Sequence, residues 1–380
     1  MRTSTERILT THVGSLPRPE KLAVLLLQED RGEPVEPMEL EQVIGDAVAA
    51  AVQRQAVVGI DVVSDGEMSK VSYATYINRR LSGFGGDVER QVARDLRDYP
   101  ELRRKLAALA GTQSFRRAAC IAPVTLADRA PLRRDLENFG RALKAAQVTE
   151  GFLNAASPGL VTAFQPNRHY PSHEAYLGAV ADAMREEYES IVDAGFLLQL
   201  DCPDLAMARH TGFQDLSEDD FLKRAALHVE ALNHAVASIP PDRMRMHLCW
   251  GNYEGPHDHD IELRKVLPIV VKARPAAISF EASNARHEHE WTVWRDARLP
   301  EDKVLIPGVL DTRTNYIEHP ELVAERITRF ASIVGRERVI AGSDCGFATF
   351  AGFGKLDPEI AYRKLASLVD GAAIATRQLY

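Results

Sequence analysis

The chain has 380 residues, of which 46 are basic and 54 acidic, so its formal net charge at pH 7 is −8. This acidic balance speaks against nucleic acid or an anionic membrane surface as the main partner. Hydrophobic residues make up 45% of the chain and charged residues 26%, which is typical of a globular enzyme and excludes a disordered chain. Four cysteines in this length exclude a disulfide scaffold.

The sequence gives no sign of a membrane segment or a secretion signal. No apolar run approaches the roughly 20 residues that a membrane-spanning helix needs, and the first residues, MRTSTERILTTHVGS, lack an apolar stretch followed by a cleavage site. We therefore expect a cytoplasmic protein with no membrane partner, whose thiols stay reduced.

Short apolar runs rich in β-branched residues alternate along the chain with longer segments of helical spacing. The runs expected to form strands are 8–13, 60–64, 160–164, 197–200, 244–248, 277–280, 304–310 and 339–341. The segments expected to form helices include 40–58, 176–192, 219–238 and 320–334. Strand–helix alternation requires parallel strands joined by right-handed crossovers.

Eight such units predict an α/β fold of the (β/α)8, or TIM, barrel type, with residues 1–380 forming one catalytic domain. The charged segment 87–151 is expected to be an insertion between the second and third barrel strands. An open doubly wound sheet is the alternative architecture, but no GxGxxG motif follows an early strand.

Chemically capable residues follow several of the expected strands, and in a barrel these positions meet at the face that hosts active sites. His247 and Cys249 share one side of an extended strand end, because side chains alternate with a period of two. Glu281 and Cys345 follow later strands. Imidazole, thiolate and carboxylate ligands together suit Zn²⁺. The alternative is that the cysteines are small buried apolar residues and His247 a hydrogen-bonded core histidine.

Seven motifs occur in order across nearly the whole chain: TTHVGSLPRP, VVSDGEMSK, LQLDCPD, MHLCWGN, ISFEASN, IPGVLDT and IAGSDCGF. Together they resemble the catalytic barrel of cobalamin-independent methionine synthase and its short, single-barrel relatives. The resemblance implies a zinc-dependent thiol alkyltransferase, in which coordination to zinc removes the proton of the acceptor thiol.

The resemblance also assigns roles to individual residues. It implies that His247, Cys249, Glu281 and Cys345 bind the zinc ion. It implies substrate contacts from Val13, Gly14 and Ser15, and it implies that the carboxylates of Glu67 and Asp201 hold the amino group of homocysteine. An ammonium partner would give two buried carboxylates a physical reason to be there.

Three features depart from the family pattern. The chain has no room for the second barrel that precedes the catalytic barrel in full-length members, and the stretch SPGLVTAFQPNRHY lacks the Trp that stacks on the folate. Arg313 stands where the family has its general-acid His, and Arg cannot relay a proton near pH 7. Arg313 could instead bind an anionic group, or form an ion pair with Asp311 or Glu318.

Two loops carry paired histidines: His257 and His259 in one, His287 and His289 in the other. Such pairs could hold a second metal ion, although histidines on loops are more often solvated or hydrogen-bonding. After the second pair come Trp291 and Trp294, which we expect to form an apolar wall over the alkyl donor.

The leading functional hypothesis is a zinc-dependent methyltransferase that converts homocysteine to methionine. Its donor is left open between a methylfolate, a corrinoid protein that carries the methyl group, and another methylated compound. The alternative is the opening of epoxyalkanes by coenzyme M, whose sulfonate Arg18, Arg209 or Arg313 could bind. A metal-free decarboxylase resembling uroporphyrinogen decarboxylase and a non-catalytic zinc-binding paralogue rank lower.

Overall fold

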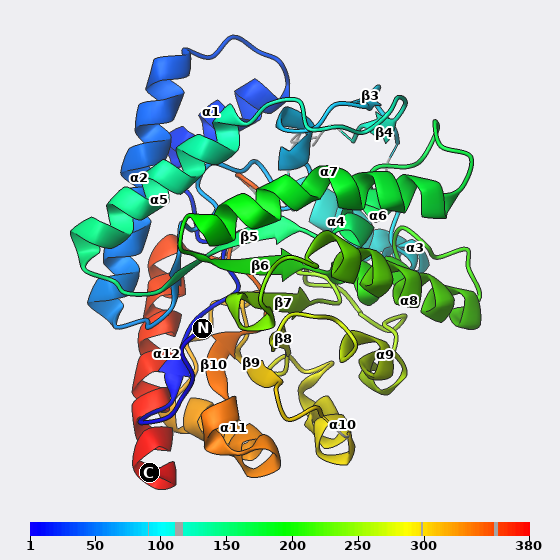
Figure 1. Cartoon of the computed structure of the whole chain (residues 1–380). Coiled ribbons are helices and arrows are strands. Elements are labelled where there is room, and N and C mark those ends of the chain that lie inside the picture. The colour runs from blue at the N-terminus through cyan, green and yellow to red at the C-terminus, as the bar shows by residue number, and fades with distance from the viewer. Residues whose placement is uncertain (90, 111–116, 298, 353–355) are drawn as a thin grey trace.

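The computed structural model describes residues 1–89, 91–110, 117–297, 299–352 and 356–380. Its centre is a sheet of eight parallel strands in the order β1-β10-β9-β8-β7-β6-β5-β2, so that consecutive barrel strands are neighbours (Figure 1). The strands are β1 (Leu9–Thr10), β2 (Val63–Ser64), β5 (Gly151–Ala156), β6 (Leu197–Asp201), β7 (Met244–Leu248), β8 (Ala277–Glu281), β9 (Val304–Leu310) and β10 (Ile340–Ser343). The backbone N–H of Val62 donates to the carbonyl of Thr10 at 3.1 Å and so links the two end strands. The predicted TIM-barrel architecture is confirmed.

Helices surround the sheet, and their starts are encoded locally. They are α1 (Glu20–Asp30), α2 (Pro37–Val58), α5 (Ala130–Ala146), α6 (Pro158–Phe164), α7 (His173–Asp193), α8 (Glu218–Ala235), α9 (Leu263–Val270), α10 (Trp291–Asp296), α11 (Pro320–Val334) and α12 (Pro358–Leu379). Ser172 and Ser217 cap α7 and α8 by accepting backbone N–H bonds. Proline occupies the first turn of α11 and α12, where its missing N–H has no cost. Among the described helices, none is both long and apolar enough to cross a membrane.

The third barrel strand is not where the sequence analysis placed it. Residues 160–164 lie in α6, because Ser157 caps the helix by accepting from the N–H of Leu160 and Pro158 starts it. The strand is β5, whose sequence GFLNAA is fully buried and pairs with β6. β5 has no β-branched residue, whereas the next run along the chain contains Val161 and Thr162. The expectation of a strand at 160–164 was therefore wrong.

The structure has an insertion between the second and third barrel strands, β2 and β5, as predicted, although it begins before residue 87 and Gly151 belongs to β5; part of it forms one rim of the barrel. It contains η1 (Tyr76–Arg79), β3 (Phe84–Gly85), α3 (Arg94–Asp98), α4 (Pro100–Ala110), β4 (Ala119–Cys120) and α5, while residues 90 and 111–116 lie outside the described part of the chain. Figure 1 shows β3, β4, α3 and α4 at the side toward which the arrows of β5 and β6 point, whereas α5 lies beside α2 on the outside. The insertion therefore covers the face where the active site is expected.

Candidate active site

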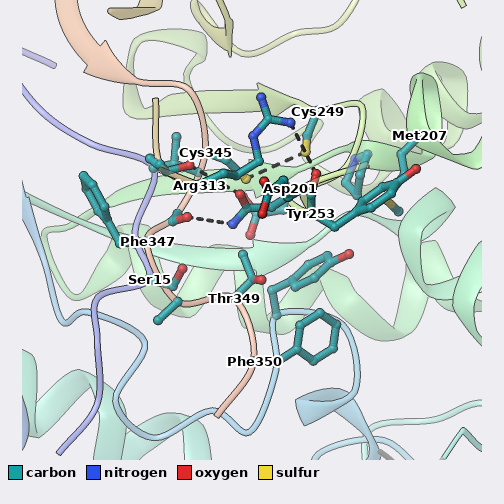
Figure 2. Close-up of a pocket in the computed structure, with 18 of the residues that line it drawn as sticks. Ser15, Asp201, Met207, Cys249, Tyr253, Arg313, Cys345, Phe347, Thr349 and Phe350 are labelled. Carbon is teal, nitrogen blue, oxygen red and sulfur yellow. Dashed lines mark hydrogen bonds between the residues drawn. The ribbon is translucent and has the colours of Figure 1, made fainter. Parts of the chain in front are cut away.

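A pocket of about 510 Å³ lies at the carboxyl ends of the barrel strands. Its walls come from the loops after most of the strands and from the insertion, which contributes Val92, Leu96 and Leu106. Figure 2 shows Cys249, Cys345 and Arg313 at one side of the pocket and Phe350 at the other. One side is thus rich in thiols and charge, and the other is aromatic.

Two cysteines and a histidine converge at the polar side. His247 lies in β7, Cys249 follows this strand, and Cys345 follows β10. One ligand atom from each side chain lies within 4.8 Å of the others, and the two Sγ atoms are 3.8 Å apart. All three side chains are buried. The extended chain at the end of β7 is the reason that residues 247 and 249 reach the same point.

These groups fit a metal ion. Burial and the nearby Arg245 lower the pKa of His247 to about 3, so its imidazole is neutral. Its Nδ1 lies 3.3 Å from the hydroxyl of Ser279, while its Nε2 is buried without a hydrogen-bond partner. The contact with Cys345 and burial raise the pKa of Cys249, so a cation is needed to hold these thiols deprotonated. A nitrogen and two sulfurs form a donor set that suits Zn²⁺.

Glu281, the fourth expected ligand, lies outside this three-residue group. Its Oε1 accepts the backbone N–H of Trp250 at 2.8 Å, and its Oε2 accepts from the side chain of Asn284 at 2.8 Å. The structure therefore brings together three of the four expected ligands and holds the fourth by hydrogen bonds beside them.

The two carboxylates assigned to the amino group both line the pocket. Asp201 accepts hydrogen bonds from Asn154 at 3.1 Å and from Gln199 at 2.9 Å. Burial raises the pKa of Asp201 to about 6 and that of Glu67 to about 7. The Oε2 atom of Glu67 is buried with no hydrogen-bond partner. A bound cation would relieve the cost of burying these charges.

The segment Val13–Ser15 lies beside these carboxylates. The carbonyl of Val13 already accepts from Asn154 at 2.8 Å and from Gln199 at 2.5 Å. The hydroxyl of Ser15 is buried, lines the pocket and has no partner. Gly14 has a φ of 136°, and a Cβ atom there would lie 2.3 Å from Oδ1 of Asn154, so this close approach requires glycine.

Sequence reasoning missed Asn154 and Gln199, which hold Asp201 in place. Asn154 lies in β5, a strand that the sequence analysis did not recognise, and Gln199 lies inside a strand whose other residues are mostly apolar. The signal that could have identified them is an amide side chain within a buried strand, because a buried amide is nearly always hydrogen-bonded.

Arg313 lines the pocket and forms an ion pair with Asp311, with Nε 3.4 Å from Oδ1. Its Nη1 also lies 3.4 Å from the carbonyl of Tyr253. Glu318, the other expected partner, binds Lys364 at 2.9 Å instead. Arg18 donates to two backbone carbonyls and, like Arg209, is not among the described residues that line the pocket.

The profile of the cobalamin-independent synthase catalytic domain matches residues 8–96 and 109–372. The chain belongs to this family. It is 25% identical over 372 residues to a methionine synthase of Saccharolobus solfataricus, covering 97% of this chain and 95% of that protein. A methionine synthase of Sulfolobus acidocaldarius is 24% identical, with 97% and 93% covered.

Two solved structures have the same fold as this cobalamin-independent synthase domain. A B12-independent methionine synthase from Shewanella sp. W3-18-1, in complex with selenomethionine, superposes with a TM-score of 0.72 at 20% identity and covers 98% of this chain and 99% of its own. A putative vitamin-B12-independent methionine synthase from Listeria monocytogenes gives 0.65 at 18% identity, with 97% and 98% covered. The family resemblance drawn from the seven motifs is confirmed, and a family described as cobalamin-independent gives no support to a corrinoid donor.

The prediction that Trp291 and Trp294 form an apolar wall over the alkyl donor is wrong. Trp294 is 1% exposed and packs against Phe280, with ring centroids 4.3 Å apart. The ring of Trp291 faces the guanidinium groups of Arg295 and Arg329. Neither tryptophan is among the described residues of the pocket wall, because α10 places both on the outer side of the barrel, whereas the apolar wall is built by the insertion and by the segment after β10.

Proposed function

We propose that this protein is a zinc-dependent methyltransferase that methylates the thiol of homocysteine to give methionine. One observation carries the proposal: three buried polar atoms without partners belong to residues that line one pocket. They are Nε2 of His247, Oε2 of Glu67 and Oγ of Ser15. Buried polar atoms are normally satisfied, so each of these indicates a group supplied by a ligand.

The three atoms match three parts of a thiol amino acid and its metal. Nε2 of His247, with Cys249 and Cys345, would hold the ion. The carboxylates of Glu67 and Asp201 would bind the ammonium group, and the hydroxyl of Ser15 would donate to the carboxylate. When bound, zinc lowers the pKa of a thiol so that it reacts as a thiolate near neutral pH. Glu281 lies beside the ion site and would join or leave it through a change of its side-chain rotamer.

The remaining walls would position the donor. The sulfur of the acceptor forms a bond to the methyl carbon, and the bond between this carbon and the donor breaks with its electrons going to the donor. Arg313 keeps its proton near pH 7, so it would bind an anionic part of the donor or its departing negative charge. Met207, Phe347 and Phe350 give the apolar contacts. A methylfolate and another small methylated compound both fit this description.

A test of the acceptor is titration calorimetry of the zinc-loaded protein with homocysteine, run in buffers of different ionisation enthalpy to count protons. We expect one homocysteine to bind per chain. Methionine is the matched ligand without a thiol, so it accounts for the protons that Glu67 and Asp201 release when the ammonium group binds, and homocysteine should release about one proton more than methionine does. Coenzyme M, a thiol with a sulfonate and no amine, should bind more weakly because it faces two carboxylates.

Stronger binding of coenzyme M than of homocysteine would contradict the proposal and favour the epoxide-opening alternative, with Arg313 as the sulfonate ligand. Homocysteine binding that releases no more protons than methionine binding would contradict thiol activation at this site.

A further inference from the structure

A second group of metal-type side chains lies behind the wall of the pocket, built from three histidines around one aspartate. Oδ2 of Asp260 lies 2.9 Å from Nδ1 of His257 and 2.9 Å from Nε2 of His287. Oδ1 of Asp260 lies 3.1 Å from Nδ1 of His210. The four side chains are at most 3% exposed. One ligand atom from each of His257, Asp260 and His287 lies within 4.8 Å of the others.

The outer nitrogen of each ring has its own acceptor. Nδ1 of His287 lies 2.9 Å from the carboxylate of Glu290, and Nε2 of His257 lies 3.0 Å from the carbonyl of Tyr253. Nε2 of His210 lies 3.3 Å from the hydroxyl of the same tyrosine. When the outer nitrogen donates, the inner nitrogen carries a lone pair that points toward Asp260. Metal-binding histidines are normally held in this way by a carboxylate or a carbonyl.

Hydrogen bonding alone leaves part of this group unexplained. Nδ1 of His210 and Oδ1 of Asp260 are buried and lack a hydrogen-bond partner, although they are 3.1 Å apart. If protons filled the group instead, His257 and His287 would both be imidazolium ions paired with Asp260. One divalent cation replaces those two protons without a change in total charge.

We propose that His257, Asp260 and His287 form a second cation site, distinct from the thiol site and sharing no residue with it. Two imidazoles and a carboxylate suit Zn²⁺ or a neighbouring first-row divalent ion better than Mg²⁺ or Ca²⁺.

The site would fix part of the pocket wall. It ties the loop of residues 251–260 to the segment that precedes α10, and Tyr253 and Arg313, which line the pocket, contact His257 directly. A cation there would fix the ring of His257 and, with it, the carbonyl of Tyr253, which lies 3.0 Å from Nε2 of His257 and 3.4 Å from Nη1 of Arg313, without touching the substrate. The site does not depend on the identity of that substrate.

The test counts zinc by mass spectrometry after the protein has been equilibrated with Zn²⁺ and passed through a desalting column. The wild-type chain should hold two equivalents. Cys249→Ala/Cys345→Ala, which leaves the histidine group intact, should hold one. Adding His287→Gln to this parent should remove the remaining equivalent, while adding His289→Gln, an exposed histidine nearby, should not.

No zinc in the parent would overturn the proposal and leave the group as a hydrogen-bonded ionic cluster. One equivalent in both the wild type and the parent would instead contradict zinc binding at the thiol site and leave the second site standing. Equal zinc in the parent and in its His287→Gln form would overturn it too. The parent is informative even if the His287→Gln form does not fold. Co²⁺ gives a second readout: in the parent it should show ligand-field bands without the intense thiolate-to-cobalt absorption that the wild type shows.

Discussion

Glu67→Gln should stabilise the ligand-free protein at alkaline pH while weakening its binding of homocysteine. Burial raises the pKa of Glu67 from its ordinary 4.5 to about 7. Between these values the folded protein holds the proton that the unfolded chain has lost, so the stability of the fold decreases as pH rises through this window. A change of about 2.5 pKa units corresponds to roughly 3 kcal/mol at pH 8 and to about 1 kcal/mol at pH 5.

The assay is urea unfolding of the metal-free wild type and variant at both pH values. Glutamine keeps the shape of the side chain and removes the charge, so the advantage of the variant should grow from pH 5 to pH 8. The matched control is Glu187→Gln: this buried carboxylate is paired with Arg80 at 3.0 Å, and its loss should destabilise the fold at both pH values. An advantage of Glu67→Gln that does not change with pH, or a loss of stability at pH 8, would contradict a raised pKa for the buried carboxyl of Glu67.

Three further predictions concern the same pocket. Cys249→Ser and Cys345→Ser should each lose most of the zinc of the thiol site, measured against the wild type in the presence of a competing chelator; full retention in both would contradict the ligand assignment. Asp201→Asn should weaken homocysteine binding about 10- to 100-fold, because a hydrogen bond to a charged group is lost, and should leave the zinc content unchanged; equal affinity would remove its amino-group role. Gly14→Ala should lower the free energy of unfolding by about 1–3 kcal/mol through backbone strain and contact with Asn154; an unchanged urea midpoint would contradict the packing described.

The sequence predicted most of the barrel because most of its strands carry the β-branched signal of buried parallel strands. Three strands, β5, β6 and β7, lack β-branched residues, and of these β5 was missed, because the run after it contains Val161 and Thr162 and resembles a strand although Ser157 caps it as a helix. Tertiary context, in the form of pairing with β6, outweighed local preference.

The sequence predicted the part of the site that lies at the end of a single strand. The alternation of an extended chain predicts that His247 and Cys249 share one side, whereas the approach of Cys345 within 3.8 Å depends on the closed barrel. The apolar walls from the insertion could not be foreseen, because α3 and α4 approach the pocket only through the fold of the intact chain. Of the paired histidines, His257 and His287 meet at Asp260, while His259 pairs with Asp98 at 2.6 Å.

In the mechanism proposed above, the acceptor thiol reacts as a ligand of an ion held by His247, Cys249 and Cys345. X-ray absorption at the zinc edge tests it most directly, using His287→Gln to confine zinc to the thiol site. The two cysteines should give two sulfur neighbours before homocysteine is added, and a third sulfur should appear afterwards. An unchanged sulfur count with homocysteine bound would contradict binding of the acceptor thiol to the ion.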